Sequence, residues 1–101
     1  MEIKIMLIII TYDVATNSSL GKKRLSKIAK ECQNYARRVQ NSVFECEIDY
    51  ATWRKVKAIL LKIVNEAEDS IRFYYLGDKF QNRVEHYGKN KSLYSTEPII
   101  I

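Results

Sequence analysis

The pattern of hydrophobic positions changes period several times along the chain, and each change predicts a new element. Residues 3–12 are almost continuously apolar and β-branched, which is typical of a strand covered on both faces. From about residue 20 to 37 the apolar side chains recur every three or four positions, which predicts an amphipathic helix. Its N-cap is expected to be Asn17, Ser18 or Ser19.

The second half of the chain repeats this alternation. A strand hairpin is expected with arms at about 36–40 and 42–48, followed by Asp49 as the cap of a second helix. The apolar stripe of this helix runs into the acidic stretch 66–69, although acidic groups are unfavourable at a helix C-terminus. Residues 70–76 then return to a strand pattern.

The predicted order βαββαβ defines a fold class. We expect an α+β, ferredoxin-like sandwich in which four strands form one sheet and both helices lie on one of its faces. The chain is interpreted as a single domain, with a core over residues 1–77 and a C-terminal extension over residues 78–101. The extension contains two short candidate strands, at 83–87 and 99–101.

This plan leaves one face of the sheet without a cover. The first strand is apolar on both faces, and the chain has no third helix to pack on the second one. A second copy of the chain is the simplest cover, and small homo-oligomers are most often two-fold dimers. We therefore expect a homodimer.

Length and composition narrow the class of protein. The 101 residues are 47% hydrophobic and 29% charged, as in a folded domain rather than a disordered chain. The longest apolar run, Ile5 to Ile10, is too short for a membrane span or a signal sequence, so we expect a cytoplasmic protein with no membrane partner. Cys32 and Cys46 fit buried thiols, and their spacing argues against zinc or iron–sulfur sites.

The positive charge is concentrated in one segment. The net charge is +5, but residues 20–39 alone hold seven basic groups and one acidic group. This segment indicates an anionic partner such as nucleic acid, or else simply a solvated helix face. The residues that would contact phosphates are Lys23, Lys27 and Lys30 on the outward stripe and Arg37 and Arg38 near the helix end, where basic groups also suit the helix dipole.

Asp13 is the most unusual acidic residue because it ends the apolar first strand. One interpretation is an Asx turn or a cap for the following loop. The other is a ligand for Mg²⁺ or Mn²⁺, shared with Asp13 of a second chain and used to activate water against a phosphodiester. His86, the single histidine, and Ser42, which has no base nearby in the sequence, are weak candidates for catalysis.

Three strings carry a family resemblance: Ile10 to Val14, Arg38 to Cys46, and Arg72 to Gly77. In one-letter code they read ITYDV, RVQNSVFEC and RFYYLG. Together they resemble the smaller of the two CRISPR adaptation proteins, the Cas-two endonucleases, in the version typical of the subtype I-C branch. The resemblance runs almost from end to end of the chain.

The resemblance implies a ferredoxin-like homodimer in which the C-terminal extension of each chain completes the sheet of its partner. It implies that Asp13 and its symmetry mate bind a divalent metal, Mg²⁺ or Mn²⁺. The other motif positions are Tyr12, Arg38, Ser42, Phe44 and Glu45. Of these, Arg38 would contact phosphate and Phe44 would pack at the site.

Two functions follow from this family. One is a metal-dependent endonuclease that cuts double-stranded DNA or single-stranded RNA during CRISPR adaptation. The alternative is a scaffold that binds DNA through its basic helix, Arg37 and Arg38 and bridges dimers of the CRISPR integrase, which performs the chemistry. The string from Arg38 to Glu45 disfavours a third reading, a toxin-like ribonuclease of the same fold.

Overall fold

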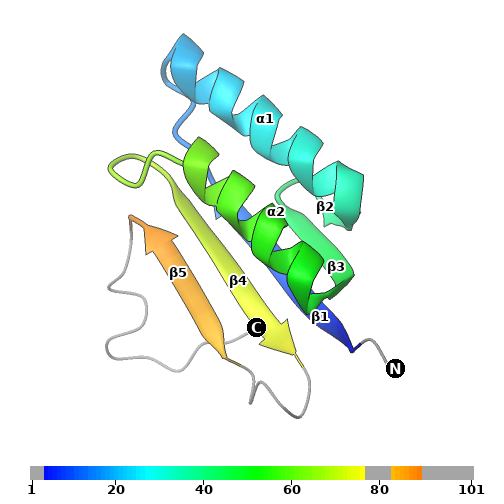
Figure 1. Cartoon of the computed structure of the whole chain (residues 1–101). Coiled ribbons are helices and arrows are strands. Elements are labelled where there is room, and N and C mark those ends of the chain that lie inside the picture. The colour runs from blue at the N-terminus through cyan, green and yellow to red at the C-terminus, as the bar shows by residue number, and fades with distance from the viewer. Residues whose placement is uncertain (1–3, 77–82, 90–101) are drawn as a thin grey trace.

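The computed structural model describes residues 4–76 and 83–89 and confirms the predicted order of elements (Figure 1). The order βαββαβ is followed by one further strand. The elements are β1 (Ile5–Asp13), α1 (Ser19–Tyr35), β2 (Arg37–Gln40), β3 (Val43–Asp49), α2 (Tyr50–Ile63), β4 (Ser70–Leu76) and β5 (Val84–Gly88).

The strands form one antiparallel sheet in the order β2-β3-β1-β4-β5, so β1 lies at its centre. Both helices lie side by side on one face of the sheet, as expected (Figure 1). β5 pairs with β4 of its own chain. The candidate strand 99–101 lies outside the described residues, and the contact of the extension with a partner chain stays a prediction.

The core lies between the helices and the sheet. Alternate residues of the central strands face the helices and are fully buried, among them Ile8, Ile10 and Phe73. Trp53 of α2 packs edge-on against Phe73 and donates a hydrogen bond of 3.1 Å to the Tyr75 hydroxyl. The periodicity of the sequence therefore identified the buried sides of both helices and of β3.

Both cysteines are free and buried, as predicted. Burial, together with the nearby Cys46 thiol, raises the pKa of Cys32 to about 12, and burial raises the pKa of Cys46 to about 11. Both groups therefore stay protonated at neutral pH and are poor nucleophiles. In the part of the chain that the structure describes, no helix is long and apolar enough to cross a membrane.

Both predicted helix ends were too late. α1 ends at Tyr35, because Ala36 is extended and its N–H closes the last turn on the Cys32 carbonyl. Arg37 therefore begins β2 instead of lying at a helix C-terminus. α2 ends at Ile63, so the acidic stretch 66–69 follows the helix as a turn and does not oppose the helix dipole.

The outward face of β1 is open in the single chain, as expected when both helices lie on the other face of the sheet. The side chains on this face remain accessible in the single chain, with Ile5 60% and Leu7 38% exposed. Ile9, two positions further on, is half-buried. The apolar residues that predicted a doubly covered strand thus form an open stripe along the middle of the sheet.

Candidate functional site

Asp13 ends β1 on the open face of the sheet, and its carboxylate is exposed. An Asx turn would use the N–H of Ala15, two residues further on. That N–H instead donates to Asp69 at 3.0 Å, and Ser18 rather than Asp13 caps α1. Among the described residues, no hydrogen bond or ion pair reaches the Asp13 side chain. The carboxylate is therefore available for another ligand.

Tyr12, Phe44 and Arg38 meet on the helix-covered face at the same end of β1. The Tyr12 and Phe44 rings lie nearly parallel with their centroids 6.1 Å apart, and the Arg38 guanidinium lies 5.1 Å from the Phe44 centroid. Phe44 is fully buried, so it positions Arg38 and does not itself reach a substrate. Because side chains alternate along a strand, Tyr12 and Asp13 face opposite sides of the sheet.

The remaining polar groups of the motif show no activated nucleophile. Burial raises the pKa of Tyr12, partly offset by a hydrogen bond from Arg38, so the phenol stays protonated and donates to the Asn41 carbonyl at 3.3 Å. The Ser42 carbonyl accepts the Tyr12 backbone N–H at 3.2 Å. Within residues 4–76 and 83–89, no basic side chain forms a hydrogen bond with the Ser42 hydroxyl. Glu45 is held in an ion pair with Arg37 at 2.7 Å.

The described residues of one chain offer few side chains that could bind a metal ion together. Within the described residues, no group of three or more His, Cys, Asp or Glu side chains could enclose an ion. Mg²⁺ accepts one or two carboxylates and retains several water ligands, so the free carboxylate of Asp13 fits such an ion as a single protein ligand. A second carboxylate at this position would have to come from another chain.

The basic stripe on α1 is exposed, as predicted for Lys23, Lys27 and Lys30. Lys23 and Lys27 also line a hollow of about 360 Å³ between the two helices, opposite Lys62 near the end of α2. Lys62 is not among the residues predicted from the sequence, because its distance along the chain from the other lysines gives no sign that the helices would place it there. We call the surface formed by Lys23, Lys27 and Lys62 the basic groove.

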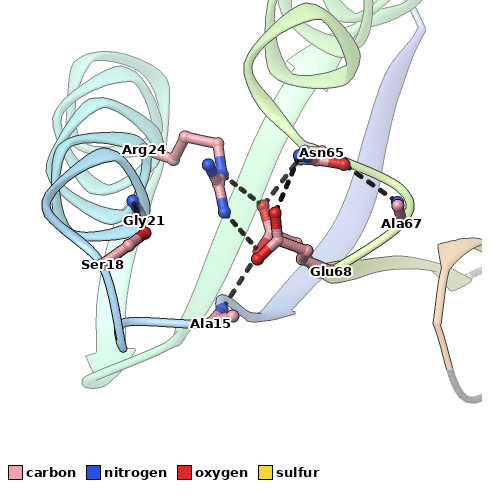
Figure 2. Close-up of polar contacts among 8 residues, drawn as sticks. Ala15, Ser18, Gly21, Arg24, Asn65, Ala67 and Glu68 are labelled. Atoms are coloured by element: carbon pink, nitrogen blue, oxygen red, sulfur yellow. Dashed lines mark hydrogen bonds and ion pairs between the residues drawn. The ribbon is translucent and has the colours of Figure 1, made fainter.

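Arg24, at the base of this groove, is neutralised within the chain. It reaches from α1 to the turn that carries Asn65 (Figure 2) and binds Asp69 through both carboxylate oxygens, at 2.7 and 3.2 Å. Asp69 also accepts the backbone N–H groups of Ala15 and Asn65, each at 3.0 Å. Burial alone would raise the pKa of Asp69, but these hydrogen bonds hold it below its usual range. One acidic residue of the stretch 66–69 therefore has a structural role, because Asp69 pairs with Arg24 and accepts two backbone N–H groups.

Ion pairs within the chain reduce the positive charge that the predicted basic segment presents to a binding partner. Arg24 and Arg37 are each bound to a carboxylate, whereas the three predicted lysines of α1 and Arg38 have no ion pair among the described residues. Arg38 lies in β2, close to the end of β1, whereas the lysines lie on α1. The predicted nucleic-acid contacts therefore fall into two separate places.

A family model described as CRISPR associated protein Cas2 matches residues 6–84, which include β1, both helices and Arg38. The chain belongs to the Cas2 family. A CRISPR-associated endonuclease Cas2 from Halalkalibacterium halodurans is 48% identical over 95 residues, covering 94% of this chain and 99% of the relative. A CRISPR-associated endoribonuclease Cas2 from Chlorobaculum tepidum is 53% identical over 83 residues, covering 82% and 86%.

Solved Cas2 structures have the same fold. The crystal structure of Cas2 from Streptococcus pyogenes at pH 6.5 superposes with a TM-score of 0.67 and 50% sequence identity, covering 79% of this chain and 96% of that one. A second Cas2 crystal structure matches 97% of this chain and 100% of its own, with a TM-score of 0.57 and 28% identity. The five-stranded antiparallel sheet with two helices is therefore a Cas2 fold.

Proposed function

We propose that this Cas2-family chain is a metal-dependent endonuclease of CRISPR adaptation whose site is built on Asp13. The observation that carries the proposal is the exposed Asp13 carboxylate at the end of the central strand, without a partner among the described residues. The names of the two relatives, an endonuclease and an endoribonuclease, support phosphodiester cleavage as the reaction.

The complete site requires a homodimer formed through the open face of the sheet. A two-fold axis along β1 would stack the apolar stripe of Leu7 and Ile9 on its own copy. The same axis would bring the two Asp13 side chains to the same end of the dimer, because β1 of both chains would then run in the same direction.

In this proposal two Asp13 carboxylates hold the metal, and Arg38 contacts phosphate beyond the edge of the sheet. Bound Mg²⁺ or Mn²⁺ supplies a water of lowered pKa and stabilises charge on the phosphate. Tyr12 and Phe44 act as positioning residues, since both are buried and stacked beside Arg38. Ser42 shapes the turn beside them through its carbonyl.

The substrate is proposed to be double-stranded DNA, with single-stranded RNA as the second possibility. The motif strings of the chain resemble the subtype I-C branch, which is associated with double-stranded DNA. The relative from H. halodurans is named an endonuclease and is matched over 99% of its length. Incubating the protein with labelled duplex DNA and with single-stranded RNA of the same sequence would separate the two substrates.

Asp13→Asn tests the metal site directly. We expect cleavage to fall at least about a hundredfold, because the amide removes the charge that would hold the metal, while the urea midpoint stays unchanged. Glu66→Gln is the matched control, since Glu66 is an exposed carboxylate elsewhere on the surface. Cleavage by Asp13→Asn with an unchanged rate and metal dependence would overturn the assignment.

A second candidate function is the non-catalytic scaffold that holds DNA between dimers of the CRISPR integrase. The basic groove favours it, because Lys23, Lys27 and Lys62 converge there from two helices without neutralising partners among the described residues. Lys30 would continue this surface along α1. In this role the chain binds duplex DNA through phosphates, and its own cleavage activity is not required for integration.

Charge reversal in the groove separates the scaffold role from the nuclease. The triple change of Lys23, Lys27 and Lys62 to Glu should weaken duplex DNA binding and reduce the slope of log K against log salt by about 0.9 for each phosphate that the variant no longer neutralises. Lys55→Glu, an exposed lysine of α2 that does not line the groove, is the control. An unchanged salt slope in a fluorescence anisotropy titration would contradict a scaffold role for the groove.

A further inference from the structure

A second hollow lies on the helix-covered face, at the opposite end of β1 from Asp13. It has a volume of about 320 Å³ and lies between α2, β4 and the edge strand β5. β5 forms the edge of the sheet beyond β4 (Figure 1). We call this space the α2–β5 hollow, and the side chains that define it are Tyr50, Arg54, Lys57, Tyr75, Arg83 and Glu85. Its size is within the usual range of small-ligand sites.

The rim of the hollow combines flat aromatic rings with guanidinium groups. The Arg83 guanidinium lies 4.9 Å from the centroid of Tyr75, and the Arg54 guanidinium lies 5.9 Å from the centroid of Tyr50. Tyr50 is 59% exposed, so its ring is accessible from solvent. The Tyr75 ring is itself buried, so Tyr50 is the ring that a ligand can reach. An exposed tyrosine beside arginines can stack on a nucleobase and bind phosphate.

A carboxylate in the wall adds a hydrogen-bond acceptor. Oε1 of Glu85 accepts from Lys57 at 2.7 Å and from the Tyr75 hydroxyl at 2.6 Å. Within the described parts of the chain, Oε2 of Glu85 accepts no hydrogen bond. Burial alone would raise the pKa of Glu85, but the bonds from Lys57 and Tyr75 lower it, so the group is ionised at neutral pH. An ionised acceptor beside aromatic rings suits a base that carries an amino group.

These features together exclude simpler ligands. An apolar ligand would have to desolvate the charges of Arg54 and Arg83 without pairing them. A bare phosphate would use the arginines but would offer no hydrogen-bond donor to Oε2 of Glu85. A nucleotide matches both parts, because its base offers N–H donors and a flat ring while its phosphate is negative.

We propose that the α2–β5 hollow binds a single nucleotide, with an amino group of the base donating to Glu85 and the phosphate held by Arg54 and Arg83. The nucleotide is either a free mononucleotide or one residue of a single strand. This site is separate from Asp13 and from the basic groove. It would be a third place on the chain where a nucleotide or nucleic acid binds. It does not depend on the nuclease proposal.

Trp53 provides the measurement, since it is the only tryptophan of the chain and lines the hollow. Titration of the full chain with cytidine monophosphate should change its fluorescence saturably. A short single strand of dC that binds more tightly per site than the mononucleotide would identify a strand as the source, whereas equal affinities would identify the free nucleotide. No saturable change at millimolar mononucleotide and with the strand would overturn the proposal.

Variants test whether the change in Trp53 fluorescence depends on the side chains of the α2–β5 hollow. Arg83→Ala should weaken binding about tenfold, because one charged hydrogen-bond partner is removed. Lys55→Ala, an exposed residue outside the hollow, should leave it unchanged. Asp13→Asn should also leave it unchanged, so failure of the nuclease proposal would be seen separately. Equal affinities of Arg83→Ala and Lys55→Ala would overturn the site.

Base preference tests the role of Glu85. Uridine monophosphate has a carbonyl where cytidine has its amino group, so we expect it to bind more weakly than cytidine monophosphate to the natural chain. Glu85→Gln should reduce this preference. If that variant loses its fold because Lys57 is left unpaired, the comparison of the two nucleotides on the natural chain still decides the matter. Equal binding of both would refute the contact with Glu85.

Discussion

At the scale of the residue, Asp69 connects three parts of the chain that the sequence separates widely. Its buried carboxylate joins the loop after β1 through Ala15, α1 through Arg24, and the turn after α2 through Asn65. All four hydrogen bonds favour the ionised form, which offsets the cost of burying the charge. The same contacts leave Asp13 unbound, because Asp69 takes the N–H that an Asx turn at Asp13 would have used.

Asp69→Asn should lower the free energy of unfolding by about 3 kcal/mol, as expected when one partner of a buried ion pair is removed. Urea unfolding at pH 7 measures the difference, with the exposed Glu66→Gln as the control. A loss no larger than that of the control would show that the buried pair contributes little.

The same carboxylate predicts a pH dependence. The pKa of Asp69 is lower in the folded chain than the value of about 3.9 of an unfolded aspartate. The unfolded chain therefore takes up the proton first as the pH falls, so the stabilisation is complete above about pH 4 and is lost below it. The natural chain and Asp69→Asn should converge in stability as the pH is lowered from 5 to 2. A difference that stays constant over this range would contradict the assignment.

At the scale of the element, α1 begins where its first turn touches the loop after β1. Ser18 caps the helix by accepting the Gly21 N–H at 3.1 Å. Gly21 is buried against this loop, and a Cβ atom at this position would collide with the Ala15 carbonyl oxygen. Glycine is unfavourable inside a helix, but the close approach of helix and loop requires it at this position.

Gly21→Ala should destabilise the folded chain, although replacing glycine by alanine usually stabilises a helix. Alanine is normally more favourable than glycine in a helix by about 1 kcal/mol. Here the added methyl group meets backbone, which cannot move aside cheaply, so we expect a loss of about 1–3 kcal/mol. Thermal unfolding gives the measurement, and Ser26→Ala, at an exposed position of the same helix, should be neutral or slightly stabilising. A stabilised Gly21→Ala would refute the close approach.

At the scale of the whole molecule, the arrangement of the two helices decides which surfaces remain available. They cover one face of the sheet and leave the stripe of Ile5, Leu7 and Ile9 open on the other (Figure 1). An apolar stripe of this kind along a central strand favours association with another protein surface. The proposed metal site lies at the end of the same stripe, so dimer formation and metal binding should be linked.

Leu7→Asp should convert the proposed dimer to a monomer, because it places a charge in the middle of the interface. Light scattering after size-exclusion chromatography should give twice the chain mass for the natural protein and the mass of one chain for the variant. Ile59→Asp is the matched control, since Ile59 on α2 is 37% exposed, close to the 38% of Leu7. A monomeric natural chain would contradict the dimer, and with it the shared metal site.

The sequence by itself determined the order of the elements, the buried sides of both helices and β3, and the cap at Asp49, because these depend on neighbours within one or two turns. It narrowed the cap of the first helix to three residues, of which the structure uses Ser18. It also marked Asp13 as unusual, since an acidic residue directly after an apolar strand is visible locally. The helix ends were misplaced because apolar spacing continues past the point where the backbone changes conformation, as it does at Ala36 and Val64.

Only the tertiary structure decided which charges are free. Arg24 and Asp69 are 45 residues apart, and their pairing removes one cation from the basic segment. Lys62 joins the lysines of α1 only because the two helices lie side by side. Ion pairs and grooves depend on distances between elements, which no local pattern contains. The sequence could therefore nominate the functional residues, while folding decided which of them keep an unneutralised charge at the surface.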